Sequence, residues 1–433
     1  MPQELIQINA RNRSTKIVFV ITIVIATLWS YFAFRWYLGN TMAEYFNTAD
    51  NNLELAQVAR NLAPNDPITN WRLAQVSQKK LPLDQSVVSL SQFEKAVSLS
   101  PNDYRFWVAL GTARGQAGDM TGGEQALRQA VALAPSYANP HWYLGNLLLR
   151  SNRYDEAFAE LRTASESDPQ SLRTQMFNLV WAVNSSDFEA LKNAVGPNPE
   201  ARAQFALYLL NQKQFEDGLR MWGSLSAEQK KATKTTGDSI LAVLITNLRF
   251  KDAFTIWNDL APVPAYRVEE GRMTDGGFED QIAYTPEFVF GWQVRNVPQM
   301  EMGIDPTISH TGSRSLRLVF AVRAALETIN AAQLVPVANS TEYDFECFVK
   351  TSKLQSGGPP IIQIVDTTNG AVLGTSDPAL SDSDWNRIGF SFKTSEKTEA
   401  VVVRISRAEC EDPKLCPIYG SIWYDDFSLK RRN

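Results

Sequence analysis

The chain has 433 residues, of which 44% are hydrophobic and 21% are charged. This is a globular composition, and it excludes a wholly disordered chain. The formal net charge of −5 disfavours a dedicated nucleic-acid binder, because such proteins carry a basic surplus that neutralises phosphates. Two histidines and three cysteines leave little material for a zinc site or a histidine-based catalytic triad.

The first predicted element is a membrane anchor at residues 17–38. Ile17 to Phe34 is an uncharged run of 18 residues. As a helix it spans ~27 Å, close to the ~30 Å hydrocarbon core of a bilayer. Basic residues precede the run, and only Arg35 follows it closely. The positive-inside rule therefore predicts that residues 1–16 form a cytoplasmic tail in a bacterial inner (cytoplasmic) membrane, with the bulk of the chain periplasmic or extracytoplasmic.

Two other interpretations of this segment stay open. Thr41-Met42-Ala43 offers a small-residue site at which a signal peptide is cut, and the run can also be a buried helix of a soluble protein. Against cleavage, the apolar run is longer than the usual signal-peptide core, and charged and aromatic residues separate it from that site.

A helical repeat array is predicted for residues 42–260. Pro101, Pro135 and Pro169 lie 34 residues apart, and small and aromatic residues recur at fixed offsets between them. Within each period Leu110-Gly111 and Leu144-Gly145 occupy the same two positions. These residues resemble the tetratricopeptide repeat, in which small residues let two antiparallel helices approach closely and the proline ends each unit. Helical periodicity without the full pattern continues to about Leu260.

The tetratricopeptide resemblance implies a concave groove that binds protein partners. The residues at the positions that face this groove in the family are predicted to form a peptide-binding site. A groove that holds only solvent, or that is filled by the chain's own next element, is an equally weighted alternative. The candidates in this sequence are Arg105, Thr112, Asn139, Trp142, Asn146 and Arg150.

After a predicted linker at residues 261–271, the pattern changes to short alternating strands. Residues 315–321, 342–350 and 387–393 alternate apolar and polar side chains and are separated by turn-forming residues. This pattern favours an all-β sandwich over residues 272–433. The whole chain is thus predicted to be multidomain: a single transmembrane helix, an α-solenoid of tetratricopeptide-like helix pairs, and an all-β jelly-roll sandwich.

An ordered set of motifs makes the second resemblance specific. Gly277-Phe278-Glu279, His310-Thr311-Gly312-Ser313 and Trp423-Tyr424-Asp425-Asp426-Phe427 occur in that order. They resemble the carbohydrate-binding modules of families 4 and 9, which have a galactose-binding-like jelly roll.

This resemblance implies two sites. The family often carries a structural calcium ion, for which Glu279, Asp425 and Asp426 are the matching carboxylates, with an ordinary solvated turn as the alternative. Glycan binding needs an aromatic face flanked by polar groups. The predicted glycan residues, placed on one outward face, are Asp344, Glu346, Phe348, Gln363 and Arg404.

The cysteines predict one disulfide bond. Cys410 and Cys416 bracket a short loop, and a disulfide there suits an extracytoplasmic location better than the weak metal motif that the same spacing provides.

The sequence predicts a non-enzymatic, membrane-anchored envelope protein that requires no cofactor. Its repeats bind protein partners and its sandwich binds a glycan, in support of polysaccharide assembly, export or surface retention. The alternative is a pure assembly scaffold whose sandwich has no carbohydrate ligand. A glycan-processing enzyme is disfavoured because the repeats leave no room for a catalytic domain.

Overall fold

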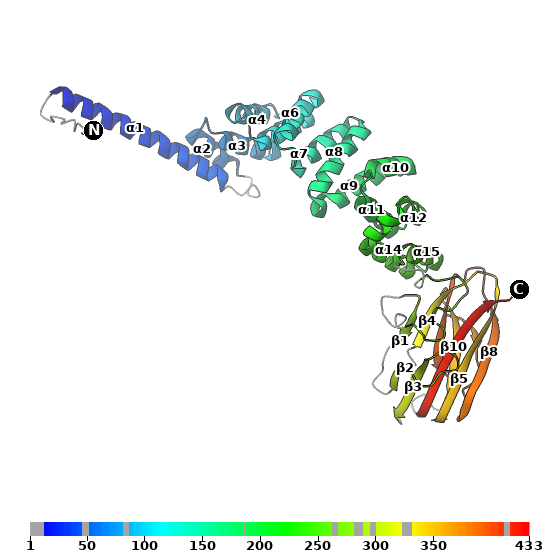
Figure 1. Ribbon diagram of the computed structural model, residues 1–433. Coiled ribbons are helices and arrows are strands. Elements are labelled where there is room, and N and C mark those ends of the chain that lie inside the picture. The colour runs from blue at the N-terminus through cyan, green and yellow to red at the C-terminus, as the bar shows by residue number, and fades with distance from the viewer. Residues whose placement is uncertain are drawn as a thin grey trace, which may run out of the picture. The chain divides into compact units, whose positions relative to one another are not determined.

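The fold is taken from a computed structural model. It describes residues 13–45, 52–80, 86–185, 187–261, 267–280, 289–294, 300–322, 331–410 and 416–432. The described chain divides into two compact units, Met1–Gly196 and Pro197–Asn433. The described residues of the first unit form helices and their connections, and those of the second combine helices with a β-sandwich (Figure 1). This arrangement confirms the predicted fold class.

The first unit contains ten helices among its described residues. They are α1 (Arg13–Glu44), α2 (Leu53–Leu62), α3 (Pro67–Lys80), α4 (Ser86–Leu99), α5 (Tyr104–Gln116), α6 (Met120–Leu133), α7 (Ala138–Arg150), α8 (Tyr154–Ser167), α9 (Pro169–Asn184) and α10 (Phe188–Val195). Local sequence explains several helix starts. Asp103 and Asp119 cap α5 and α6 through their carboxylates, while Pro169 occupies the first turn of α9, where no amide donor is needed.

The α5–α6 and α7–α8 pairs pack closely because a glycine faces the second helix of each pair. A Cβ at Gly111 would lie 2.9 Å from the Gly123 carbonyl oxygen and 2.6 Å from Leu127. A Cβ at Gly145 would lie 3.1 Å from the Ala157 oxygen and 2.7 Å from a Leu161 carbon. The small residues of the repeat are therefore required by close helix contact.

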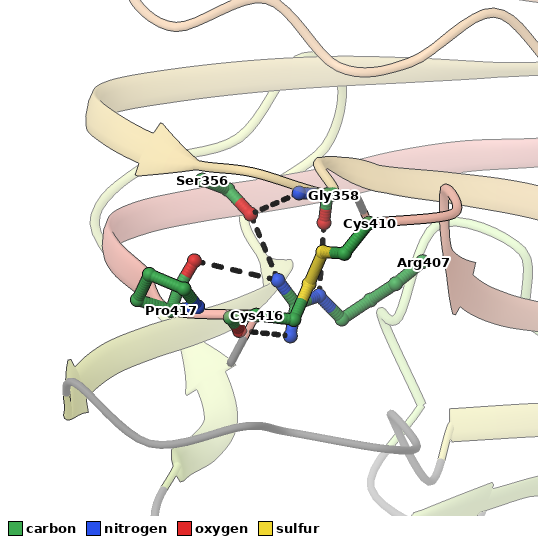
Figure 2. The surroundings of a disulfide bond; sticks show 6 residues. All are labelled: Ser356, Gly358, Arg407, Cys410, Cys416 and Pro417. Atoms are coloured by element: carbon green, nitrogen blue, oxygen red, sulfur yellow. Dashed lines mark hydrogen bonds between the residues drawn. A yellow bond between two sulfur atoms is a disulfide. The ribbon is translucent and has the colours of Figure 1, made fainter. Parts of the chain in front are cut away.

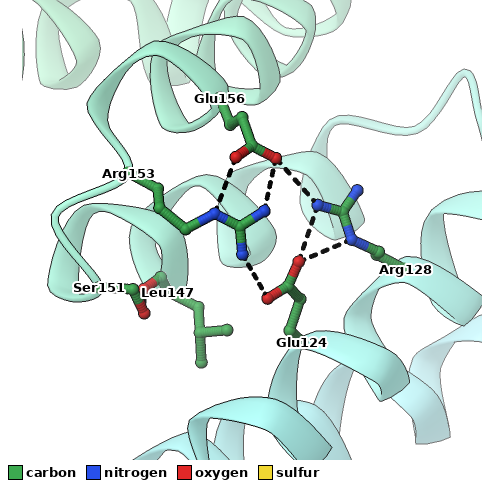
Figure 3. A network of polar contacts seen from close by, with 6 residues as sticks. All are labelled: Glu124, Arg128, Leu147, Ser151, Arg153 and Glu156. Carbon is green, nitrogen blue, oxygen red and sulfur yellow. Dashed lines mark hydrogen bonds and ion pairs between the residues drawn. The ribbon is translucent and has the colours of Figure 1, made fainter.

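An exposed ion-pair network joins the second helices of these two repeats. Arg153, just before α8, donates to Glu124 on α6 and to Glu156 on α8 (Figure 3). Arg128 on α6 contacts the same two carboxylates. The network links neighbouring repeats on a solvated surface, where each pair adds little stability.

The second unit begins with five helices among its described residues. They are α11 (Pro199–Asn211), α12 (Phe215–Gly223), α13 (Ala227–Ala232), α14 (Lys234–Thr246) and α15 (Phe250–Leu260). The last helix is fixed to the sandwich: the Lys251 amide donates to Glu399, and the Asn258 side chain makes two hydrogen bonds with Val268. Of the predicted linker, residues 262–266 lie outside the described part of the chain.

The sandwich consists of two five-stranded antiparallel sheets. Its strands are β1 (Trp292–Val294), β2 (Met300–Asp305), β3 (Ser315–Val322), β4 (Ala331–Pro336), β5 (Glu342–Ser356), β6 (Pro360–Asp366), β7 (Val372–Thr375), β8 (Ser383–Lys393), β9 (Ala400–Arg407) and β10 (Ile418–Arg431). The first sheet has the order β1-β4-β9-β6-β7, and the second has the order β2-β3-β10-β5-β8. Inward-facing rings such as Trp292, Phe345 and Phe427 fill the space between the sheets, as the alternation predicts.

Candidate functional site

A concave groove of about 340 Å³ crosses the first helices of three successive repeats. We call it the repeat groove. Its lining residues come from α3 (Trp71, Gln75, Gln78), α4 (Phe93), α5 (Tyr104, Arg105, Val108, Ala109, Thr112) and α7 (Asn139, Tyr143). The structure thus brings together three of the predicted peptide-site residues, Arg105, Thr112 and Asn139.

Two groove residues are held in place by their neighbours. Arg105 donates through Nε and Nη2 to the capping carboxylate of Asp103, and Thr112 donates to the Val108 carbonyl oxygen. The hydrogen bond from Arg105 lowers the pKa of Asp103, so the pair is ionised. The Arg105 side chain nevertheless remains 52% exposed, which leaves its guanidinium accessible to a ligand.

Other polar groups in the groove retain hydrogen-bonding capacity. Asn139 is exposed, and within the described part of the chain its amide makes no hydrogen bond. The indole Nε1 of Trp71 is buried and lacks an acceptor among the same residues. A buried donor without an acceptor is costly, and a ligand carbonyl is one group that would satisfy it.

The other three predicted peptide-site residues lie on α7 outside this groove. Asn146 donates to the Trp142 carbonyl oxygen, and Arg150 donates to that of Gly115. Trp71 and Tyr143, by contrast, line the groove and were missed by sequence reasoning. The repeat that contains Trp71 departs from the consensus in its first helix, so positional counting gave no signal there.

The predicted glycan residues of β5 lie on the outer face of the second sheet and are already paired. Glu346 accepts from Arg387 of β8 and Lys430 of β10. Asp344 accepts from Ser391, and the ring of Phe348 is stacked against His310 at 3.7 Å. These contacts satisfy the groups that a sugar would need to recruit.

Gln363 and Arg404 do not lie on that face, so this part of the prediction is wrong. They are register partners on β6 and β9 of the first sheet, and Arg404 donates to the Gln363 Oε1 atom. Alternation along a strand reveals which side chains point outward, but it does not reveal to which of two sheets the strand belongs.

The three predicted calcium ligands converge on the turn at residues 310–314. Glu279 accepts from the amides of Ser313 and Arg314, and Asp425 accepts from the amide of His310. Asp426 accepts from the His310 ring and the Thr311 hydroxyl. Hydrogen bonding from Ser313 lowers the pKa of Glu279, while burial raises the pKa of Asp425.

As arranged, these carboxylates are engaged in hydrogen bonds with the protein. Their oxygens face N–H and O–H donors, whereas calcium requires several converging oxygen ligands. Within the described residues, no group of three or more acidic, histidine or cysteine side chains is arranged to hold a metal. The cluster instead ties the first and last segments of the sandwich to one turn, and calcium binding stays a prediction.

This turn helps to form an aromatic cluster, of which the sequence analysis predicted Phe348 as a site residue but not His310 or Trp385. His310 stacks on Phe348 and meets the edge of Trp385 of β8 at 5.7 Å. Lys350 and Asp384 form an ion pair on the two strands that carry Phe348 and Trp385. The register of β5 on β8 brings these groups together, and such pairing between distant segments is not encoded in local alternation.

The two predicted cysteines form a disulfide bond. Cys410 and Cys416 are joined above the guanidinium of Arg407 (Figure 2). Arg407 donates to the carbonyl oxygens of Gly358 and Cys416 and to the Ser356 hydroxyl. The bond therefore closes a loop that one partly buried arginine already ties to the neighbouring strands.

Comparisons with known proteins identify the repeats of the first unit. Two tetratricopeptide-repeat family models match, over residues 88–138 and 116–177. The chain contains tetratricopeptide repeats. Repeats of this type and carbohydrate-binding modules typically lack catalytic residues. No curated protein matches the sequence.

Three solved structures illustrate the likenesses. A CBM4 module is 10% identical with a TM-score of 0.29, covering 37% of this chain and 99% of its own. The MamA RS-1 ArsTM double mutant is 23% identical with a TM-score of 0.27, covering 33% of this chain and 75% of its own. The CBM22-1–GH10 modules of Clostridium thermocellum xylanase 10B, complexed with xylohexaose, are 14% identical with a TM-score of 0.24, covering 34% of this chain and 27% of their own. These TM-scores are low, and the function of this chain does not follow from them.

Proposed function

We propose that this protein is a non-enzymatic, membrane-anchored adaptor that binds a segment of a partner protein in its repeat groove. The observation that carries the proposal is the groove itself, in which aromatic walls, an accessible arginine, an exposed amide and a buried indole without an acceptor lie together. Aromatic rings supply contact area, and Asn139 and Trp71 supply hydrogen bonds to a peptide backbone.

The membrane anchor of the adaptor is α1. This helix is long and apolar enough to cross a membrane, although by length and composition alone a signal sequence fits equally. The basic residues before the apolar run support an orientation with the N-terminus in the cytoplasm and both folded units outside it. A disulfide between Cys410 and Cys416 is compatible with that location.

Site-specific photo-cross-linking in intact cells tests the groove. A photoreactive amino acid at Thr112 is expected to capture a partner, whereas the same group at Arg128, on the exposed ion-pair network, is not. Replacing Asn139 with alanine should lower the yield at position 112 about five- to tenfold, the loss expected for one hydrogen bond. The matched Asn146→Ala change, on the same helix outside the groove, should leave it unchanged. Equal capture at both positions, or none at 112, would contradict the proposal.

Glycan binding by the sandwich is a second candidate function, supported by the His310–Phe348–Trp385 cluster. Flat rings beside charged groups suit the apolar faces and hydroxyl edges of sugars. A glycan-binding sandwich on a membrane-anchored adaptor would suit polysaccharide assembly, export or surface retention. The satisfied pairs of Asp344 and Glu346 support the alternative, a scaffold without a sugar ligand.

Titration of the detergent-solubilised full chain against a glycan panel separates these two possibilities. Saturable binding that Trp385→Ala weakens at least tenfold, with Trp423→Phe as a control on the β10 strand, would support glycan recognition. The absence of saturable binding across the panel would support the scaffold.

A further inference from the structure

The helix α1 is longer than a membrane span requires. It is continuous over 32 residues from Arg13 to Glu44. At ~1.5 Å per residue it extends about 48 Å, against a hydrocarbon core of ~30 Å. Its uncharged run ends at Phe34, and the interfacial residues Arg35, Trp36 and Tyr37 follow directly. The last two turns therefore project beyond the lipid.

Those last turns are packed as a repeat helix. Gly39 and Ala43 are the buried residues of α1, whereas its apolar window is fully unburied. A Cβ at Gly39 would lie 2.7 Å from the Ala59 carbonyl oxygen and 2.9 Å from the Ala63 side chain. Gly111 and Gly145 show the same geometry: each faces a backbone oxygen on the second helix and the side chain four residues later. The α1–α2 pair is thus built like the two complete tetratricopeptide units.

Polar contacts reinforce this packing. Arg35 donates to the Asn61 carbonyl oxygen, and Asn40 donates to the Asp66 carboxylate. The residue just before the alternative cleavage point takes part as well, because the carbonyl oxygen of Ala43 accepts from Arg72 of α3. Cleavage after Ala43 would remove a helix from the folded array and leave the Asp66 and Arg72 side chains without these partners.

The same end of α1 reaches the repeat groove. The guanidinium of Arg72 lies 5.0 Å from the ring of Trp71, which lines the groove, and also contacts Gln75 of the lining. The charge of Glu44 contributes to the raised pKa of Arg105, after the larger effect of the Asp103 hydrogen bond. Glu44 lies ten positions after Phe34, about 15 Å further along the helix, so the end of α1 that contacts α3 beside the groove lies close to the bilayer surface.

We infer that α1 is at once the membrane span and the first helix of the repeat array, and that the groove receives the membrane-flanking segment of another membrane-anchored protein. The inference rests on the proposed groove function. A groove held close to the bilayer encounters the membrane-flanking segments of other membrane proteins at a high effective concentration. A segment of a soluble partner has no such increase in effective concentration.

The test uses the full chain in native membranes with a photoreactive amino acid at Thr112. It compares the parent chain with a variant carrying an 18-residue Glu-Ala-Ala-Ala-Lys-type helical insert between Phe34 and Arg35. Eighteen residues make five complete turns, so the insert raises the array by about 27 Å without rotating it. A chain with the same insert directly after Tyr45, the first residue beyond α1, is the matched control, because all of α1 stays between the membrane and the array at its original length.

The parent is expected to yield an adduct with an integral membrane protein, cross-linked within about 20 residues of its span. The insert after Phe34 should reduce that adduct at least tenfold, and the control insert should not. The location of the cross-linked peptide is read from the parent alone, so it is informative even where an insert perturbs folding. An adduct with a soluble protein, or one of equal yield with the raised array, would overturn the inference while preserving the groove function. No adduct from any chain would overturn both.

Discussion

The repeat groove and the outer face of the second sheet both combine aromatic rings with polar side chains, yet their polar groups are in different states. On the sheet, Glu346 is shared between Arg387 and Lys430, and Lys350 is paired with Asp384. In the groove, Asn139 and the indole of Trp71 lack such partners within the described residues. Where groups are paired with each other, those bonds must break before a ligand can bind, whereas an exposed amide such as Asn139 has only to release water. Residue type alone therefore does not identify a binding site.

The largest expected effect comes from disturbing the helix contact that shapes the groove. Gly145→Val would place side-chain atoms against Leu161 and the Ala157 oxygen. An added Cβ alone would lie 2.7 Å from Leu161 and 3.1 Å from that oxygen. We expect the free energy of unfolding of the repeat array to fall by about 3 kcal/mol. Urea unfolding followed by far-ultraviolet circular dichroism measures this loss. The control is Gly223→Ala on α12, where an added Cβ meets nothing within 4 Å. Helix propensity favours both replacements of glycine, so an equal loss in both variants would contradict close packing at Gly145 as the cause.

A second effect concerns the pH dependence of the sandwich. Burial raises the pKa of Asp275 to about 6 from an ordinary value of 3.8. The folded state therefore binds the proton more tightly, and the stabilisation from protonation is complete below pH 3.8 and lost as the pH rises through about 6. An asparagine side chain in place of Asp275 would keep an acceptor for the Glu279 amide without the buried charge.

We expect Asp275→Asn to stabilise the sandwich by about 1 to 2 kcal/mol at pH 7, after allowance for solvent screening, and to have little effect at pH 4. Hydrogen exchange measured by mass spectrometry on peptides that contain Trp292, whose indole donates to the Asp275 carbonyl oxygen, provides a local signal for urea unfolding. If Asp275→Asn destabilises the sandwich equally at both pH values, the negative charge of Asp275 is not what lowers the stability at pH 7.

Much of the architecture was predictable because it depends on local pattern. The proline period located the repeats, and alternation located β3, β5 and β8. The pairing of Gln363 with Arg404 on the opposite sheet was not predictable, because sheet membership depends on long-range connections. The dual role of α1 was hidden for a different reason: the strong apolar signal up to Phe34 gives no information on how Gly39 packs beyond the lipid.

A smaller effect tests the paired state of the sheet surface. Hydrogen bonds from Arg387 and Lys430 lower the pKa of Glu346 below its ordinary 4.5, so the pairs stabilise the fold above that pH and this stabilisation is lost as the pH falls through the lowered value. Glu346→Gln should lower the stability of the sandwich by less than about 1 kcal/mol at pH 7, since the groups are largely exposed. The difference from the parent should vanish in acid, and a difference that persists at about pH 3 would contradict an ionic origin.

The smallest effect is expected in the groove. Asn139→Ala removes an exposed amide that is not hydrogen-bonded within the described structure, so we expect the stability of the array to change by less than about 0.5 kcal/mol. The same urea titration used for Gly145→Val measures it. A marked destabilisation would show that Asn139 is structurally engaged, and the contrast between the groove and the sheet surface would then fail.

The account depends most on the packing of α1 into the array, and a thiol cross-link measures that packing directly. Asn40→Cys combined with Asp66→Cys is expected to be joined by a short bifunctional thiol reagent in native membranes, detected as a linked peptide pair by mass spectrometry, because the two side chains are hydrogen-bonded to each other in the structure. Trp29→Cys with Asp66→Cys, whose first position is 74% exposed on the apolar part of α1, should not be linked. The absence of a linkage between positions 40 and 66, or recovery of a chain that begins after Ala43, would contradict the account.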